Sequence, residues 1–237
     1  GQLALIGELA AGVAHEINNP IYAIINFAQL IADESDKVSR AHTFGKLIME
    51  EGNRIADLTK HLVSLSRSPA GPRISVNVYE LIFNSLKLIE MQLKKDHITA
   101  KHNIPMDIPH LIANPQEIHQ VFLNLMQNAR YGLNEKFPGK DEDKILEISC
   151  NRAIIDERQY VRIIFYDRGV GIPEDILPRV KDLFFTTKPS NRGTGIGLSI
   201  SENIILKHGG KISVESIRGE FTKVLIDLPA TECTGEK

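Results

Sequence analysis

A histidine and a glutamate stand side by side in the stretch VAHEINNP, which covers residues 13–20. A neutral imidazole has one nitrogen lone pair that can attack, and a neighbouring carboxylate can hold the proton on its other nitrogen. His15 and Glu16 are therefore a candidate nucleophile and base. One histidine among eight is most simply a solvated helix residue. Glu16, Asn19 and Pro20 at these spacings favour the functional interpretation instead.

Pro20 stands inside an otherwise helical pattern. A proline in a helix interior costs about 3 kcal/mol, because it removes one backbone hydrogen bond and clashes with the carbonyl four residues earlier. His15 and Asn19 share one face of this helix, opposite Val13 and Ile17. We expect a local kink that keeps the histidine accessible to a bulky partner.

Two asparagines and a tyrosine recur at helical spacing in QVFLNLMQNARYG, residues 120–132. Asn124, Gln127 or Asn128, and Tyr131 fall on neighbouring turns, and a carboxamide oxygen is a hard ligand suited to Mg²⁺. Arg130 could reach a phosphate and Tyr131 could cover a base or ribose. An amphipathic helix with polar residues turned outward explains this stretch equally well.

Two glycine-rich stretches follow. In YDRGVGIP, Asp167 ends a strand, and a buried carboxylate there could accept the exocyclic amine of adenine. RGTGIGLSI, residues 192–200, leads into a helix whose free N–H groups suit a polyphosphate. Between them LFFTTKPSN is too short and too polar for a core element. It predicts a lid with Lys188 near a terminal phosphate.

Two long helical patterns open the chain. Apolar residues recur at spacings of three, four and seven from Leu3 to about Asp33 and again from Val38 to Leu65, with the polar turn DESDK between them. We expect an antiparallel hairpin. About six large aliphatic side chains would remain half solvated, at roughly 1.5–3 kcal/mol each for full burial. We therefore expect two copies to form a four-helix bundle in a homodimer.

The remaining sequence predicts a second domain. The stretch rich in Pro, Ser and Gly around residues 67–73 is a linker, after which strand patterns and helix patterns mix. Helices against a mostly antiparallel mixed sheet make a two-layer α/β sandwich. The predicted domains are residues 1–66, a helical hairpin, and residues 74–237, the sandwich.

The overall charge and apolar content of the chain argue against nucleic acid as a partner and against a membrane span. A net charge of −2 over 237 residues gives no electrostatic footprint for nucleic acid, and no apolar run approaches the roughly 20 residues that span a bilayer. Cys150 and Cys233 are far apart and form no CxxC pair, which favours a reducing, cytoplasmic compartment. The chain begins already in helical pattern, so we expect a fragment whose parent carries a sensor or membrane part.

The motifs HEINNP, NLMQNARYG, DRGVG, LFFTT and GTGIGL, taken together and in this order, resemble those of the dimeric sensor histidine kinases of two-component signalling. The resemblance covers nearly the whole chain. It implies an all-α dimerisation and phosphotransfer hairpin followed by an α/β sandwich of the histidine-kinase, gyrase and chaperone ATPase type. The implied ligands are ATP and Mg²⁺, and the implied partner is a response-regulator receiver domain.

The resemblance also implies residue roles. His15 would be phosphorylated, Glu16 would act as its base, and Asn19 would position a water for dephosphorylation of the regulator. Asn128 would bind Mg²⁺ with support from Asn124. The nucleotide would be held by Arg130, Tyr131, Asp167, Gly169, Gly171, Lys188, Gly193, Thr194, Gly195, Gly197 and Leu198.

Two other functions fit parts of the sequence. A stand-alone ATPase or clamp of the same superfamily carries a glutamate four residues before the metal-binding asparagine, where this chain has Asn124. A catalytically dead, nucleotide-binding scaffold is disfavoured because each motif is intact. Only residues 188–192 separate LFFTT from GTGIGL, so this lid offers few groups for the γ-phosphate. The signal, the cognate regulator and transfer within or between protomers are not defined by the sequence.

Overall fold

The computed structural model describes residues 2–66, 71–189, 193 and 195–231, and within the helices it omits the side chains of residues 2–16, 54, 57–58 and 60–66. The chain forms two compact units. The first comprises Gly1–Ala70 with Thr186–Thr194, and the second comprises Gly71–Phe185 with Gly195–Lys237. Residues 67–70 of the predicted linker lie outside the described residues.

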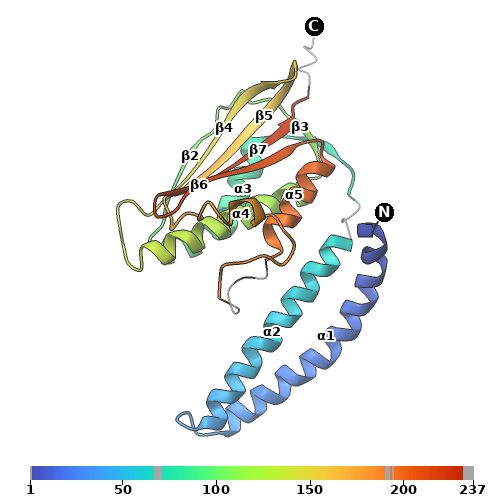
Figure 1. Ribbon diagram of the computed structural model, residues 1–237, viewed down its shortest axis with the longest axis vertical. Helices are drawn as coiled ribbons and strands as arrows, with labels where there is room; N and C mark the ends of the chain where they lie inside the picture. The colour runs from blue at the N-terminus through green and yellow to red at the C-terminus, as the bar shows by residue number, and fades with distance from the viewer. Residues whose placement is uncertain (1, 67–70, 190–192, 194, 232–237) are drawn as a thin grey trace. The chain divides into compact units, whose positions relative to one another are not determined.

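The first unit contains the predicted helical hairpin. Helices α1 (Gln2–Glu34) and α2 (Arg40–Ser66) run antiparallel, as Figure 1 shows, and their bounds closely match the sequence prediction. The turn between them is closed by hydrogen bonds: the Ser39 N–H donates to Asp36 O at 2.8 Å, and the His42 ring Nδ1 donates to Ala32 O at 2.8 Å. Helix α1 continues through Pro20.

Small residues fill the contact between the two helices. Ala28, Ala32 and Ala56 are 2–3% exposed. A Cβ atom added to Gly45 would lie 2.8 Å from Ala28 O, and one added to Gly52 would lie 2.5 Å from a side-chain carbon of Ile25. Gly45 therefore allows close approach of the two helices, and Gly52 makes room for the Ile25 side chain of the facing helix.

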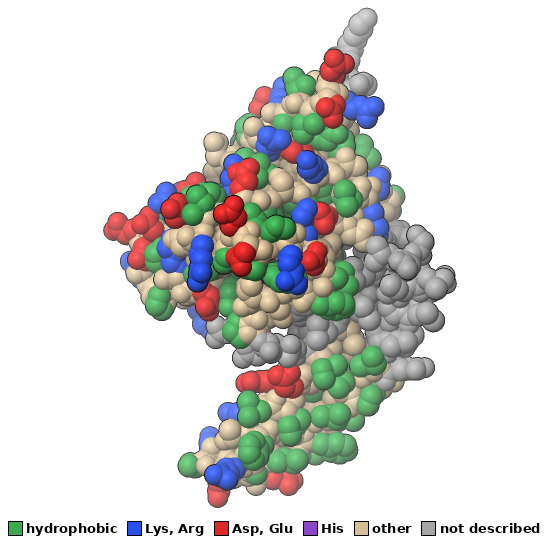
Figure 2. All heavy atoms as spheres, in the orientation of Figure 1, with side chains coloured by type: hydrophobic (Ala, Val, Ile, Leu, Met, Phe, Trp, Pro, Cys, Tyr) green, Lys and Arg blue, Asp and Glu red, His purple; other side chains and the backbone are tan. Residues whose placement is uncertain are grey.

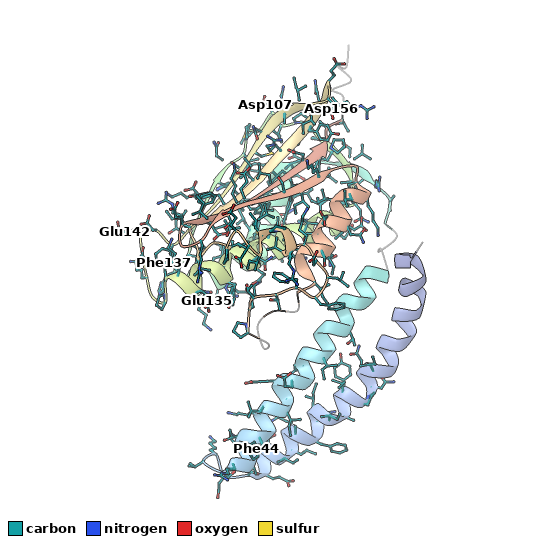
Figure 3. The ribbon with its side chains drawn as sticks, viewed as in Figure 1. Phe44, Asp107, Glu135, Phe137, Glu142 and Asp156 are labelled. Carbon is teal, nitrogen blue, oxygen red and sulfur yellow. The ribbon has the colours of Figure 1, made fainter. Side chains whose placement is uncertain are left out.

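The large apolar side chains of the hairpin lie outside this contact, as the sequence led us to expect. Figure 2 shows apolar side chains gathered along the described part of the hairpin, and Figure 3 shows Phe44 projecting from α2 near the turn. Eight of these side chains are 37–65% exposed: Ile17, Ile24, Phe27, Ile31, Phe44, Leu47, Ile48 and Ile55. Among the described residues, no helix combines the length and apolar content needed to cross a membrane.

The second unit is a two-layer sandwich. Its five-stranded sheet has the order β2-β4-β5-β7-β6, in which β2 pairs parallel to β4 and the other pairs are antiparallel. The strands are β2 (Thr99–Asn103), β4 (Ile145–Ile155), β5 (Arg158–Asp167), β6 (Lys211–Ile217) and β7 (Phe221–Pro229). A separate antiparallel pair joins β1 (Ile74–Val76) to β3 (Leu111–Ala113), and the sequence pattern had not indicated β3.

Three helices form the other layer. Figure 1 shows α3 (Val78–Lys95), α4 (Pro115–Lys136) and α5 (Gly197–Lys207) grouped beside the sheet, and a short 3₁₀ helix, η1 (Leu177–Arg179), precedes α5. Asn77 and Asn114 cap α3 and α4, each through a side-chain oxygen that accepts N–H groups of the first turn. Phe122 of α4 packs on Phe165 of β5, with ring centroids 5.4 Å apart.

Side chains of strand β5 alternate between the helix-covered face and the outer face of the sheet. Val161, Ile163 and Phe165 are at most 2% exposed and continue as a buried row to Asp167 at the strand end. The opposite face of the sheet carries an ion pair in which Arg162 donates to both carboxylate oxygens of Asp227, at 2.6 and 2.9 Å. The same face carries the stacked rings of Tyr166 and Phe221, so the sandwich has a filled apolar interior and a mixed outer face.

Candidate functional site

Asn124 connects α4 to the start of α5. Its Nδ2 donates to Gly197 O at 3.2 Å and reaches the Ser201 hydroxyl at 3.5 Å. A Cβ atom added to Gly197 would lie 3.8 Å from the Asn124 carboxamide carbon, so the two helices meet closely at this point. The glycine-rich start of α5, which includes Leu198, is thus brought to the asparagine-bearing face of α4.

Asn128 and Tyr131 lie on the next turns of α4, four and seven residues after Asn124. Both are half-buried. The helix therefore presents two carboxamides and a phenol on one face, which is the arrangement that the sequence predicted.

Asp167 is a buried carboxylate with unusual electrostatics. It is 6% exposed, and burial raises its pKa to about 7, although the Gly169 N–H donates to Oδ1 at 2.9 Å and lowers the pKa in part. A carboxylate in this setting gains from a further hydrogen-bond donor. An exocyclic amine of a flat heterocycle is such a donor, and reading adenine in this way stays a prediction for Asp167.

Glycines hold the chain after β5 close to α4. A Cβ atom on Gly169 would lie 2.6 Å from the carbonyl carbon of Gly132, and the Val170 N–H donates to Gly132 O at 3.2 Å. Gly171 has φ +65°, and a Cβ atom there would lie 2.1 Å from Ile217 O. A side chain at Gly169 would separate the chain after Asp167 from the end of α4, and one at Gly171 would push it away from the end of β6.

The segment between β5 and α5 is also built around glycines. Gly195 has φ +67°, and a Cβ atom there would lie 2.4 Å from the carbonyl carbon of Phe184, whose own φ is +66°. Gly193 packs on Thr186 and Lys188, and the Lys188 N–H donates to the Thr186 hydroxyl at 3.1 Å. Thr194 lies outside the described residues.

Arg130 lies elsewhere. Its Nε donates to Asp96 Oδ2 at 2.5 Å and its Nη1 to Gln92 Oε1 at 3.2 Å, which places the guanidinium against α3. Asn134 donates to the same Asp96 oxygen at 2.7 Å. Burial opposes ionisation of Asp96, but the hydrogen bonds from Arg130 and Asn134 hold its pKa below the ordinary value. Arg130 is two residues from Asn128, so it points about 200° away around the helix.

In the hairpin the structure separates the two neighbouring asparagines of the histidine motif. Asn18 faces α2, where its Oδ1 is hydrogen-bonded to the Thr59 hydroxyl, whereas Asn19 is exposed. The backbone at His15 and Glu16 is helical within α1, and their side chains lie outside the described residues. The structural use of Asn18 was not predicted, because its partner is distant in sequence.

Comparison with known proteins matches both units. The His Kinase A (phospho-acceptor) domain matches residues 5–71, and the family of histidine kinase-, DNA gyrase B- and HSP90-like ATPases matches residues 113–232. The sensor histidine kinase ZraS of Salmonella typhimurium is 32% identical over 228 residues, a match that covers 96% of this chain and 46% of ZraS. This chain thus spans less than half of that relative's length.

Solved structures agree. Histidine kinase ThkA in complex with the response regulator protein TrrA is 28% identical, with a TM-score of 0.65 over 97% of this chain and 63% of that chain. Full-length ShkA in complex with AMPPNP has a TM-score of 0.69 over 95% of this chain and 46% of that chain; at 20% identity this likeness shows the fold alone. With both family domains matched in order and the asparagine, glycine and aspartate motifs brought together on α4, β5 and α5, the chain belongs to the sensor histidine kinases.

Proposed function

We propose that this chain uses Mg²⁺ and ATP to phosphorylate its own His15 and then passes the phosphoryl group to an aspartate of a response regulator. The observation that carries the proposal is the convergence, within one unit, of a buried carboxylate, two carboxamides and a glycine-rich helix start. Residues 1–66 act as the dimerisation and phosphotransfer domain, residues 67–73 as the linker, and residues 74–237 as the ATP-binding domain.

Asp167 and the glycines select the base of the nucleotide. The Asp167 carboxylate accepts a hydrogen bond from the exocyclic amine of adenine, and a guanine carbonyl at that position would meet it without a proton to share. Gly132, Gly169 and Gly171 let the backbone segments around Asp167 pack closely, which holds the carboxylate in place for the base. Tyr131 covers the base or the ribose.

Asn124, Asn128 and the start of α5 hold the polyphosphate. The carboxamide oxygens of Asn128 and Asn124 would bind and support Mg²⁺, which neutralises phosphate charge. The N-cap of α5, Ile196, makes no side-chain cap, so the N–H groups at Gly197 and Leu198 suit phosphate oxygens. The family resemblance implies that Lys188, Gly193, Thr194 and Gly195 would act as a lid for the terminal phosphate.

Arg130 has a different part in this proposal from the one that the family resemblance implied. Its pairing with Asp96 supports a role in anchoring α4 on α3 rather than in contacting the nucleotide. Arg130→Ala is therefore expected to lower the thermal midpoint while leaving the affinity for nucleotide within about twofold. A large loss of nucleotide affinity in a folded variant would instead support the nucleotide contact that the family resemblance implied.

The transfer step uses His15 and Glu16. The Nε2 lone pair of a neutral His15 forms the new N–P bond as the bond from the γ-phosphorus to the bridging oxygen breaks, and ADP leaves with that electron pair. The Glu16 carboxylate takes up the Nδ1 proton, which keeps positive charge from accumulating on the ring. The N–P bond then exchanges for an aspartyl O–P bond on the regulator.

The hairpin face supports a homodimer. Large apolar side chains at 37–65% exposure on both helices would be covered by a second copy in a four-helix bundle. The response regulator is supported as a partner by the ThkA–TrrA complex. The exposed Asn19, one turn from His15, supports a second activity, in which it orients water for dephosphorylation of the regulator.

The decisive experiment is incubation with γ-labelled ATP and Mg²⁺ beside His15→Gln. Acid-labile, base-stable label on the wild-type chain and none on the variant would establish the autokinase. Release of phosphate without protein-bound label would indicate a stand-alone ATPase instead. Glu16→Ala should slow labelling far more than it weakens ATP binding; an equal loss of both would contradict its role as base.

A further inference from the structure

A buried hydrogen bond joins α4 and α5 at the end opposite the nucleotide site. The Asn114 backbone N–H, at the N-cap of α4, donates to His208 Nε2 at 3.1 Å. His208 is the C-cap of α5, and its side chain is 1% exposed. Glu117 Oε2 lies 3.7 Å from the same nitrogen and is also buried. Asn114, Glu117 and His208 are not among the residues of the proposed nucleotide site.

The hydrogen bonds fix the state of the imidazole. His208 Nδ1 lies 2.8 Å from Ile204 O, and a carbonyl can only accept, so Nδ1 carries the proton. Nε2 therefore has a free lone pair, which the Asn114 N–H uses. Both ring nitrogens are thus satisfied in a single neutral tautomer. A side chain without an acceptor at Nε2 would leave a buried backbone N–H without its partner.

Helices α4 and α5 are tied to each other at two points. Asn124 contacts Gly197 at one end and Asn114 contacts His208 at the other, so α4 and α5 run antiparallel. The contacts are separated by about 15 Å along α4 and about 16 Å along α5. Two such ties fix how far one helix can slide along the other. That slide sets the distance between the carboxamides of α4 and the glycine-rich start of α5.

The chain entering the second unit is tied to the same helix ends. The Asn114 side chain donates to Gly71 O at 3.3 Å, and Arg73 Nη2 donates to Lys207 O at 2.6 Å. Asn114 Oδ1 also accepts the N–H groups of Gln116 and Glu117, which caps α4. Asn114 is therefore held by three separate parts of the unit.

We propose that the Asn114–His208 hydrogen bond positions the nucleotide site by fixing the slide of α4 along α5. His208 and Asn114 are positioning residues in this scheme, because both act from about 15 Å away. The inference rests on the nucleotide site proposed above. It adds that this site depends on a specific acceptor at the far end of the helix pair.

Two substitutions at His208 separate the acceptor from the rest of the ring. In His208→Gln a side-chain oxygen can take the place of Nε2 and keep the bond from Asn114. In His208→Asn the amide can take the place of Nδ1 and keep the bond to Ile204, but the acceptor is lost. We expect His208→Asn to weaken binding of AMPPNP with Mg²⁺ to the 237-residue chain about five- to tenfold, and His208→Gln to restore most of it.

Ser85→Ala is the matched control. The buried Ser85 hydroxyl accepts from His119 Nδ1 at 2.6 Å, which ties α4 to α3 rather than to α5. This variant should lower the thermal midpoint yet bind AMPPNP with wild-type affinity. Equal weakening in Ser85→Ala, or wild-type affinity in a folded His208→Asn, would overturn the positioning role. Failure of the wild-type chain to bind AMPPNP would overturn the nucleotide site itself.

Hydrogen exchange tests the same coupling without any variant. If the bond favours nucleotide binding, then nucleotide must favour the bond by the same factor. Saturating AMPPNP with Mg²⁺ should therefore slow exchange of the Asn114 amide about five- to tenfold in the wild-type chain. An unchanged exchange rate at Asn114 with the site saturated would refute the proposal.

Discussion

The hairpin and the sandwich differ in where they place their large apolar side chains. In the described part of the hairpin, Ala28, Ala32 and Ala56 are buried in the contact between α1 and α2, and many large apolar side chains are exposed. In the sandwich, large apolar side chains such as Phe122, Ile163 and Ile226 fill the interior, and the outer face of the sheet carries paired charges. Figure 2 shows the surface side of this contrast: apolar side chains line the hairpin, whereas charged side chains are scattered over the visible face of the sandwich. The described part of the hairpin leaves large apolar side chains exposed, whereas the sandwich has a filled core.

The largest expected effect comes from charging the outer face of the hairpin. In Ile24→Asp, where the wild-type side chain is 46% exposed, the dimer should dissociate, because an unpaired carboxylate cannot be buried between the helices. Sedimentation equilibrium measures this directly. The matched control is Ile154→Asp on the sandwich, at a side chain that is 79% exposed, which should leave the mass unchanged. A wild-type chain that is monomeric at all concentrations would contradict the proposed homodimer.

The next effect concerns Asp167, which probes the sandwich as a self-contained binding unit. Asp167→Asn keeps an acceptor for Gly169 but replaces the charged acceptor for adenine, so affinity for ATP should fall about 10- to 100-fold. Titration calorimetry of the wild-type chain and the variant measures the loss. Binding within twofold of wild type would exclude Asp167 as the adenine reader.

Asp167 also predicts a pH dependence of stability. Its pKa is raised to about 7 in the folded chain, so between about pH 4 and pH 7 the folded state binds more protons than the unfolded state. This group therefore makes the nucleotide-free chain less stable as pH rises through that window. Asp167→Asn should remove the decline, so its thermal midpoint should gain most on wild type above pH 7. A gain of the same size at pH 4 would contradict the assignment.

A smaller effect is expected inside the hairpin. Gly45→Ala places a methyl group against the Ala28 carbonyl, which cannot shift independently of α1. The variant should destabilise the hairpin by about 1–3 kcal/mol, despite the better helix propensity of alanine. Gly139→Ala, where a Cβ atom would meet nothing within 4 Å, is the control. Urea unfolding followed by circular dichroism would compare them, and equal midpoints would show that close helix approach is unimportant.

The smallest effect tests the polar face of the sheet. Arg162→Leu leaves the buried Asp227 carboxylate without its bidentate partner and should cost about 1–2 kcal/mol. Changing Asp227 to leucine as well should recover most of the loss, because both desolvated charges are then gone. Chemical unfolding of the single and double variants measures the recovery. A double variant less stable than the single one would mean that the pair itself holds the sheet together.

The sequence predicted what depends on local pattern. The helices of the hairpin, α4 with Pro115 at its start, and the strands β4 to β7 all follow from periodicity and from Pro and Gly positions. The strand end at Asp167 and the helix start after Gly195 were found in the same way. The order of the family motifs along the chain added the prediction that these elements form a nucleotide site.

What the sequence did not predict depends on contacts between distant residues. The Arg130 ion pair, the Asn18 bond to Thr59 and the His208 bond to Asn114 join residues that are between 34 and 94 positions apart. A polar residue on a helix looks the same in the sequence whether it faces solvent, a ligand or another helix. Helix geometry alone would have separated Arg130 from Asn128, since residues two apart do not share a face.

The parallel pairing of β2 with β4 also orders events during synthesis. Thr99 pairs beside Ile145, and both β3 and α4 lie between the two strands in the chain. β2 is an edge strand, so β4 is its only neighbour among the described strands. A growing chain must therefore leave the ribosome to about Ser149, midway along β4, before β2 can be fully paired. The apolar residues of α3 and α4 lack their full cover for longer still, because β5, β6 and β7 follow β4 in the chain, and a nascent chain with such exposed apolar surface is prone to aggregation.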